Sequence, residues 1–153
     1  MRIQLKNHHL IALIPFLRSI KLKGERSRAR SKFLGLALEA YAALHESEVD
    51  LLREYAVLDG KGNPKAAVDG SFSLREESVQ EYLAEREKLF NEVAEIEGGT
   101  YTEHLKLMRR ILLEYDDELD GDAAAMYDAL CDAFDQAIGD GTPREEGESV
   151  HAG

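Results

Sequence analysis

Residues 27–58, with the sequence SRARSKFLGLALEAYAALHESEVDLLREYAVL, decide the fold. Their apolar side chains recur three or four positions apart, which is the spacing of one stripe on a helix. The stripe consists of Phe33, Leu36, Ala37, Ala40, Tyr41, Leu44, Leu51, Tyr55 and Leu58. An unbroken helix over this segment spans roughly 48 Å, whereas a compact globule of this chain length has a diameter of about 40 Å. We therefore expect a bend, near Ser47, or a molecule that is elongated or paired.

The segment before residue 27 predicts a shorter helix. Apolar residues from Leu10 to Ile20 lie on one helical face, and Asn7 is a suitable N-cap because its side chain can accept from free backbone N–H groups. Pro15 lies too deep for a first-turn proline and is expected to kink this helix. Gly24 is expected to end the segment.

Three further amphipathic helices are predicted after the long one. The first two begin at capping boxes, formed by Ser73 with Glu76 and by Thr100 with Glu103. The last begins at Asp122. Their expected buried faces are Val79, Tyr82, Leu83, Leu89, Phe90 and Val93; Leu105, Met108, Ile111, Leu112 and Tyr115; and Met126, Tyr127, Leu130, Phe134 and Ile138.

Three short stretches are typical of strands. Residues 2–6 and 93–97 alternate polar and apolar side chains, and Asp69-Gly70 suits a type I′ turn in a small hairpin. The predicted fold class is therefore mainly α, with about five helices around one long helix and a minor β element (α+β). An all-helical bundle, with these stretches as loops, is the alternative.

Length and composition indicate one domain. The chain has 153 residues, of which 44% are hydrophobic, enough for one sizeable core. We assign residues 1–138 to a single helical domain. Residues 139–153 have almost nothing to bury and are predicted to form a disordered acidic tail.

Charge is distributed unevenly along the chain. The formal net charge is −11, which opposes non-specific attraction to nucleic acid, so direct nucleic-acid binding is not expected. Cations nevertheless gather before and within the start of the long helix, and carboxylates line the predicted last helix. The candidate partner-binding residues are Lys21, Lys23, Arg26, Arg28, Arg30 and Lys32, together with Asp128, Asp132 and Asp135. The alternative is that the cations pair with the acidic C-terminal half of the same molecule.

Arg30 lies at the edge of the apolar stripe on the helical wheel, so its guanidinium is expected to need an anion or backbone carbonyl groups. Asp120 and Asp122 are the candidate carboxylates for a structural ion pair. Arg28 and Lys32 are expected to project into solvent.

No motif for catalysis, a cofactor or a metal is present. The run Asp116–Asp122 resembles the start of a calcium loop, but Tyr127 stands where the bidentate glutamate is needed. Cys131 is the one cysteine of the chain, and no sequence neighbour would activate it. Because a single cysteine cannot form an internal disulfide, we expect a reducing cytoplasm. No apolar run is long enough for a membrane span. We expect no enzyme, no cofactor, no metal and no membrane.

A set of segments in this chain resembles a family of small proteins of unknown function encoded by phages and prophages of Gram-positive bacteria. The segments are Leu5–Asn7, Lys21–Gly24, Ser27–Arg30, Glu95–Tyr101, Leu119–Ala123 and Tyr127–Phe134. The resemblance implies the cytoplasm of a bacterial host. The resulting hypothesis is a non-enzymatic phage accessory protein that binds a phage or host protein, in particle assembly or in handling a host factor, and possible homodimer formation is part of it. The alternative is an acidic nucleic-acid mimic that inhibits a host defence or DNA-binding protein.

Overall fold

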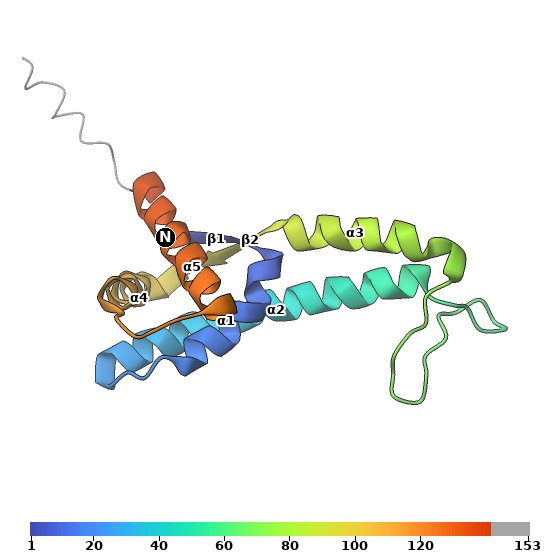
Figure 1. The fold of residues 1–153 in the computed structure, drawn as a ribbon, viewed down its shortest axis with the longest axis horizontal. Coiled ribbons are helices and arrows are strands. Elements are labelled where there is room, and N and C mark those ends of the chain that lie inside the picture. The colour runs from blue at the N-terminus through green and yellow to red at the C-terminus, as the bar shows by residue number, and fades with distance from the viewer. Residues whose placement is uncertain (142–153) are drawn as a thin grey trace, which may run out of the picture.

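A computed structural model describes residues 1–141, and its outline is elongated (Figure 1). α2 (Gly24–Tyr55) is one unbroken helix that runs along most of the molecule. Its first half belongs to a globular part, which we call the head and define as residues 1–38 and 93–141. Its second half lies beside α3 (Val79–Asn91) in a projection that we call the arm, residues 39–92. Of the expected alternatives, the molecule adopts the elongated one.

The head contains three more helices and a small sheet. The helices are α1 (Asn7–Ser19), α4 (Thr102–Glu114) and α5 (Gly121–Gly141). β1 (Arg2–Lys6) pairs antiparallel with β2 (Val93–Glu97), and Ile3 lies opposite Ile96. Ile3, Leu5 and Ile96 are buried while their neighbours are exposed, as the period of two requires. The mainly helical α+β fold class is confirmed.

The core of the head is built on the inner face of α2. Ala29, Phe33 and Ala37 are fully buried there. The Phe33 ring meets Phe134 of α5 edge-on, with 5.4 Å between the ring centroids. α1 and α4 complete the core with Leu10, Leu13, Leu17, Leu105, Met108 and Leu112. Most of the apolar stripes expected from helical spacing thus converge on one core. Tyr41, Leu58, Leu83 and Val93 were expected on the stripes as well, but they are exposed, because no other element of residues 1–141 packs over them.

Asn7 does not cap α1, although the sequence made it a suitable N-cap. Lys6 holds the cap position, and no side chain caps the helix. The buried Asn7 amide instead donates to the carbonyl oxygen of Leu89 at 2.9 Å, and its backbone N–H donates to Glu92. Carbonyl groups at the end of α3 lack their full set of helical donors. The Leu89 oxygen accepts the Glu92 N–H at 3.2 Å, and Asn7 supplies it with a second donor.

Both predicted capping boxes are wrong. A single 3-10 turn, Glu76–Ser78 or Gly99–Tyr101, precedes α3 and α4, so each helix begins later than expected and without a side-chain cap. The first residues of the two predicted helices form these 3-10 turns instead.

The long helix ends at Tyr55, three residues before its expected end at Leu58. The Asp59 carboxylate accepts from the backbone N–H groups of Lys61 and Asn63 at 2.8 and 3.0 Å, and Gly62 has φ +81°. This side-chain turn folds the chain back, so Leu58 bridges to Pro64 in extended conformation instead of adding a helical turn.

The Asp69-Gly70 turn is not type I′, because only its glycine has positive φ. The Gly70 N–H donates to the carbonyl of Ala67, and Gly70 has φ +85°. This pattern is a turn across Val68 and Asp69 followed by a left-handed glycine, another common hairpin connection. The hairpin forms isolated bridges and stays separate from the sheet, which has two strands.

The predicted domain boundary lies near the end of α5. α5 continues to Gly141, three residues beyond Ile138, where the domain was expected to end. The rest of the predicted acidic tail, residues 142–153, lies outside the described residues.

Candidate interaction surfaces

Arg30 makes the strongest contacts of the basic segment, the name we give to residues 18–32 with their cations Arg18, Lys21, Lys23, Arg26, Arg28, Arg30 and Lys32. Its Nη1 donates to the carbonyl oxygens of Leu17 and Ile20 at 2.9 and 2.6 Å. The expected ion pair with Asp120 or Asp122 is not among the ion pairs of the described residues. Backbone carbonyls at the end of α1 lie closer along the chain, and the negative end of that helix dipole favours a cation. Arg30 therefore binds the end of α1 to α2.

Two further cations of the segment are engaged within the head. Arg26 forms an ion pair with Glu114 at the end of α4. The Lys32 ammonium lies over the Tyr101 ring, 5.0 Å from its centroid, so Lys32 does not simply project into solvent. The alternative of internal pairing thus accounts for part of the predicted binding site.

The remaining cations of the segment are exposed. They are Arg18, Lys21, Lys23 and Arg28, at the end of α1, in the connection and at the start of α2. This exposed group is the part of the basic segment that is open to a partner.

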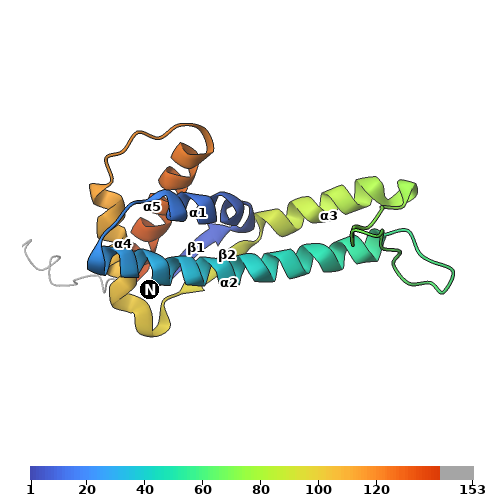
Figure 2. The ribbon, with the colours of Figure 1, turned by 90° about the horizontal axis from the view of Figure 1, so that it is seen from below.

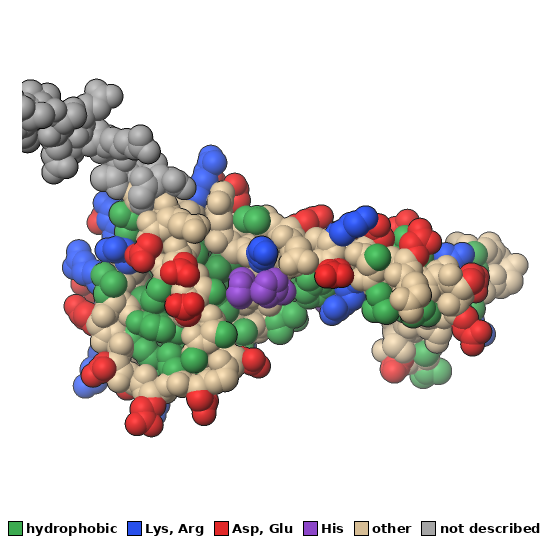
Figure 3. Space-filling view, turned by 45° about the horizontal axis from the view of Figure 1, so that its top comes forward, with side chains coloured by type: hydrophobic (Ala, Val, Ile, Leu, Met, Phe, Trp, Pro, Cys, Tyr) green, Lys and Arg blue, Asp and Glu red, His purple; other side chains and the backbone are tan. Residues whose placement is uncertain are grey.

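The predicted acidic stripe on α5 is incomplete. Asp128 and Asp132 are exposed, but Asp135 pairs with Arg109 of α4 at 3.3 Å. Asp132 also lines a shallow hollow that Lys6, His8 and His9 share. Figure 3 shows acidic side chains gathered on one face of the head, with histidine and basic groups near them. The stripe is therefore not a continuous row of free negative charge.

His8 and His9 lie against each other beside that hollow, with ring centroids 4.0 Å apart. The pKa of His9 lies below its ordinary value because burial disfavours the imidazolium, and His8 and Lys6 add repulsion. Within the part of the chain that the structure describes, no three His, Cys, Asp or Glu side chains are grouped to hold a metal ion.

Cys131 is half-buried beside the core, on α5. Burial raises the pKa of its thiol, and the carboxylates of Asp128, Asp132 and Asp135 raise it further, against a hydrogen bond with Tyr127 that lowers it. A thiol with a raised pKa is a poor nucleophile at neutral pH. These surroundings give it no catalytic activation.

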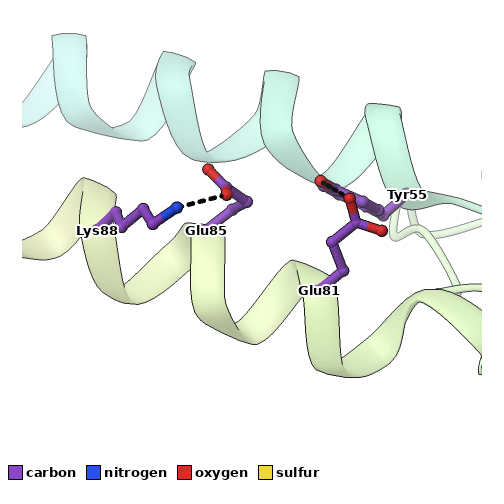
Figure 4. Close-up of polar contacts among 4 residues, drawn as sticks. All are labelled: Tyr55, Glu81, Glu85 and Lys88. Carbon is purple, nitrogen blue, oxygen red and sulfur yellow. Dashed lines mark hydrogen bonds and ion pairs between the residues drawn. The ribbon is translucent and has the colours of Figure 1, made fainter.

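The arm is held together by contacts between α2 and α3. The Tyr55 ring meets the Tyr82 ring edge-on, with 6.2 Å between the centroids. The Tyr55 hydroxyl donates to a carboxylate oxygen of Glu81 at 3.3 Å (Figure 4). Farther along, Arg86 pairs with Glu48 at 3.6 Å and lies over the Phe90 ring. The two helices therefore form a defined hairpin that projects from the head.

The end of the arm, which we call the tip and define as residues 56–75, carries exposed apolar side chains. Val57 and Leu58 are 37% and 47% exposed, and Val68 is fully exposed. Backbone hydrogen bonds hold the loop, including Val57 N–H to Ser73 and Lys65 N–H to Val57. The tip thus presents apolar groups on an ordered ribbon at the point farthest from the head (Figure 1).

The arm as a candidate binding surface was not predicted from the sequence. Its one signal was the length of the α2 stripe, which exceeds a globular diameter. The tip has a mixed composition with turn residues, so periodicity does not show that Val57, Leu58 and Val68 stay exposed.

Comparisons with protein-family models, with curated proteins and with solved structures found no match. Over the described residues, no helix combines the length and the apolar character needed to cross a membrane.

Proposed function

We propose that the chain is a non-enzymatic phage accessory protein that binds another protein through the tip of its arm. The observation that carries the proposal is the exposure of Val57, Leu58 and Val68 on a hydrogen-bonded ribbon at the end of a two-helix projection. Apolar side chains that stay partly or fully exposed together on an ordered segment are a feature of protein-binding surfaces.

The partner would be a phage or host protein met in the cytoplasm of the bacterial host, as the family resemblance implies. Among the hollows of residues 1–141, one brings histidines and charged side chains together, and its lining supports this class over an enzyme. The one beside β1 and α5 is shallow, and its titratable side chains are Lys6, His8, His9 and Asp132. None of these is a nucleophile placed against a base.

The experiment is a pull-down from lysates of a Gram-positive host, with and without phage, using the full chain as bait. A Val57→Ser, Leu58→Ser and Val68→Ser triple variant is compared with Leu113→Ser, which replaces a 61% exposed leucine on α4 of the head. We expect the same protein to be captured by the wild type and by Leu113→Ser, and lost with the triple variant. Capture that the triple variant retains contradicts binding through the tip.

The acidic nucleic-acid mimic is the weaker alternative. A mimic needs regularly spaced free carboxylates, but Asp135 is paired with Arg109 and Asp132 lies beside Lys6 and two histidines. If Asp128→Asn with Asp132→Asn abolished capture of a DNA-binding protein while the triple tip variant retained it, the mimic would replace our proposal.

A further inference from the structure

One face of α2 is left uncovered along nearly its whole length. Its positions alternate three and four residues apart, the spacing of a coiled-coil seam. They are Arg28, Ser31, Gly35, Leu38, Ala42, His45, Val49 and Leu52, of which the first six are exposed and the last two half-buried. Seen from below, α2 lies in front of the other elements of the head and beside α3 (Figure 2). This seam faces away from the core side chains Phe33 and Ala37.

Gly35, the third position of the seam, has no packing role within the monomer. It lies inside α2, where glycine is less favourable than alanine because it loses more backbone freedom. A Cβ built there would meet nothing within 4 Å. A glycine without a neighbour is explained if another helix approaches closely at this point, since only glycine leaves that space.

The charges of α2 that are not held by other elements are separated along its axis. Its first third carries Arg28 and Lys32 against Glu25, since Arg26 and Arg30 are held by Glu114 and by the end of α1. Its second half carries Glu39, Glu46, Asp50 and Glu54 against Arg53, since Glu48 is paired with Arg86. A second α2 in the antiparallel direction would place the cationic part of each helix against the acidic part of the other. A parallel arrangement would place like charges together.

We propose that two copies of the chain pair antiparallel through this seam. In the register that matches the charges, Leu38 faces Ala42 of the second copy, Gly35 faces His45 and Ser31 faces Val49. Each of these layers joins a small side chain to a larger one, which lets the helices approach closely. The twofold symmetry repeats every contact, as in an isologous interface.

Side chains beside the seam agree with this register. They place Lys32, which in the monomer lies over the Tyr101 ring, near Glu46 of the second copy. They place Glu25 near Arg53, which in the monomer also contacts Asp50 at 3.8 Å. Both flanking pairs have opposite charges. A shift by one heptad toward the C-terminal halves would bring Lys32 to Arg53 and Glu39 to Glu46, which are like charges. The favoured register also brings the two helices into full overlap from end to end. Its one repulsive contact is Glu39 with Glu39 of the second copy, close to the symmetry axis.

We choose a second copy of this chain, and not another protein, as the partner of the seam because the charges beside the seam complement those of an antiparallel copy. This interface involves the middle of α2 and leaves the tip of each arm free. Dimer formation and capture of a partner by the tip are therefore separable, and either can fail alone.

The first test measures the mass of the full chain in solution by sedimentation over a range of concentrations. We expect a dimer for the wild type. Gly35→Leu should be monomeric yet at least as resistant to heat, because leucine favours the helix, the position is exposed and a Cβ there meets nothing within 4 Å in the monomer. Ser47→Leu is the matched control, since Ser47 is exposed on α2 away from the seam, and it should stay dimeric. A monomeric wild type, or a dimer that Gly35→Leu leaves intact, overturns the proposal.

The second test examines the register. Lys32→Glu should weaken the dimer by about tenfold, because two flanking pairs become repulsive. Combining Lys32→Glu with Glu46→Lys should restore it, since the pair is re-formed with reversed sign. Glu39→Gln should strengthen the dimer by removing the repulsion at the axis. Failure of the double variant to recover the dimer excludes this register.

Discussion

Nη1 of Arg30 donates a hydrogen bond of 2.6 Å to the carbonyl oxygen of Ile20, the residue that follows the last turn of α1. The same nitrogen donates to Leu17 at 2.9 Å. A cation on α2 thus satisfies carbonyl groups that the end of α1 leaves without helical partners. Because the contact lies at the negative end of the α1 dipole, charge and hydrogen bonding act together.

Replacing Arg30 by alanine should lower the free energy of unfolding by about 2 to 4 kcal/mol, because two charge-assisted hydrogen bonds are lost and two carbonyls are left unpaired. Arg28→Ala, at an exposed position of the same helix, should change it by less than about 0.5 kcal/mol. Urea unfolding of both variants measures the difference. Equal stability would mean that the Arg30 contacts do not hold α1 to α2.

Replacing Asn7 by alanine should cost about 1 to 2 kcal/mol, because the Leu89 carbonyl loses a buried donor. Asn91→Ala is a close comparison, since the Asn91 amide also donates to a carbonyl of α3, at Glu87, but in an exposed position. That variant should lose less than about 0.5 kcal/mol. Thermal unfolding that ranks the two variants in the opposite order would contradict the role of Asn7 in joining the arm to the head.

Phe134→Ala should destabilise the chain by about 3 to 5 kcal/mol, because it leaves a cavity against the fully buried Phe33. Phe72→Ala removes a half-buried ring of the tip and should lower the free energy of unfolding by about 1 kcal/mol or less. Chemical denaturation followed by circular dichroism provides both values. A similar loss for both would show that the tip belongs to the same cooperative core.

His9 should titrate below 6.5 in the folded chain, because burial lowers its pKa and repulsion from His8 and Lys6 lowers it further. Between the folded and unfolded pKa values the unfolded chain binds more protons. The contribution of His9 to stability is therefore complete above 6.5 and is lost as pH falls through the folded pKa. NMR titration of the imidazole signals measures the pKa directly. His8→Gln should move it upward, though not fully, because burial remains the largest cause.

Cys131 should react slowly with iodoacetamide near neutral pH, because burial and three aspartates raise the pKa of its thiol. In concentrated urea the reaction should become fast, and mass spectrometry follows both rates. Rapid alkylation of the folded chain would contradict the raised pKa, because it would mean that the thiolate is populated at neutral pH.

The helices and their buried faces could be predicted because local spacing carries them. Phe33, Leu105 and Leu130 lie on apolar stripes that are visible in the sequence, and all three are fully buried. The strands around Ile3 and Ile96 could be predicted for the same reason, because alternating polar and apolar side chains are typical of a strand with one buried face. Starts of helices were less certain, because Ser73 and Thr100 have the residue types of caps but lie before 3-10 turns.

The residues of the candidate surfaces could be predicted only in part. The exposure of Arg28 and Asp128 follows from their place on a helical wheel. Paired charges do not follow, because Arg26 finds Glu114 and Asp135 finds Arg109 across different helices. The sequence also did not indicate which of the two acceptors, carboxylate or carbonyl, Arg30 would find.

By itself the sequence determined the long helix, its apolar face and the separation of charge along it, since these depend on residue type and spacing. Only the tertiary structure decided that the helix extends past the head, that α3 covers one side of its second half, and that the seam through Gly35 stays uncovered. The physical reason is that burial depends on contacts between distant segments. A helical period shows which side chains share a face, but the elements packed around the helix decide which of its faces meets solvent.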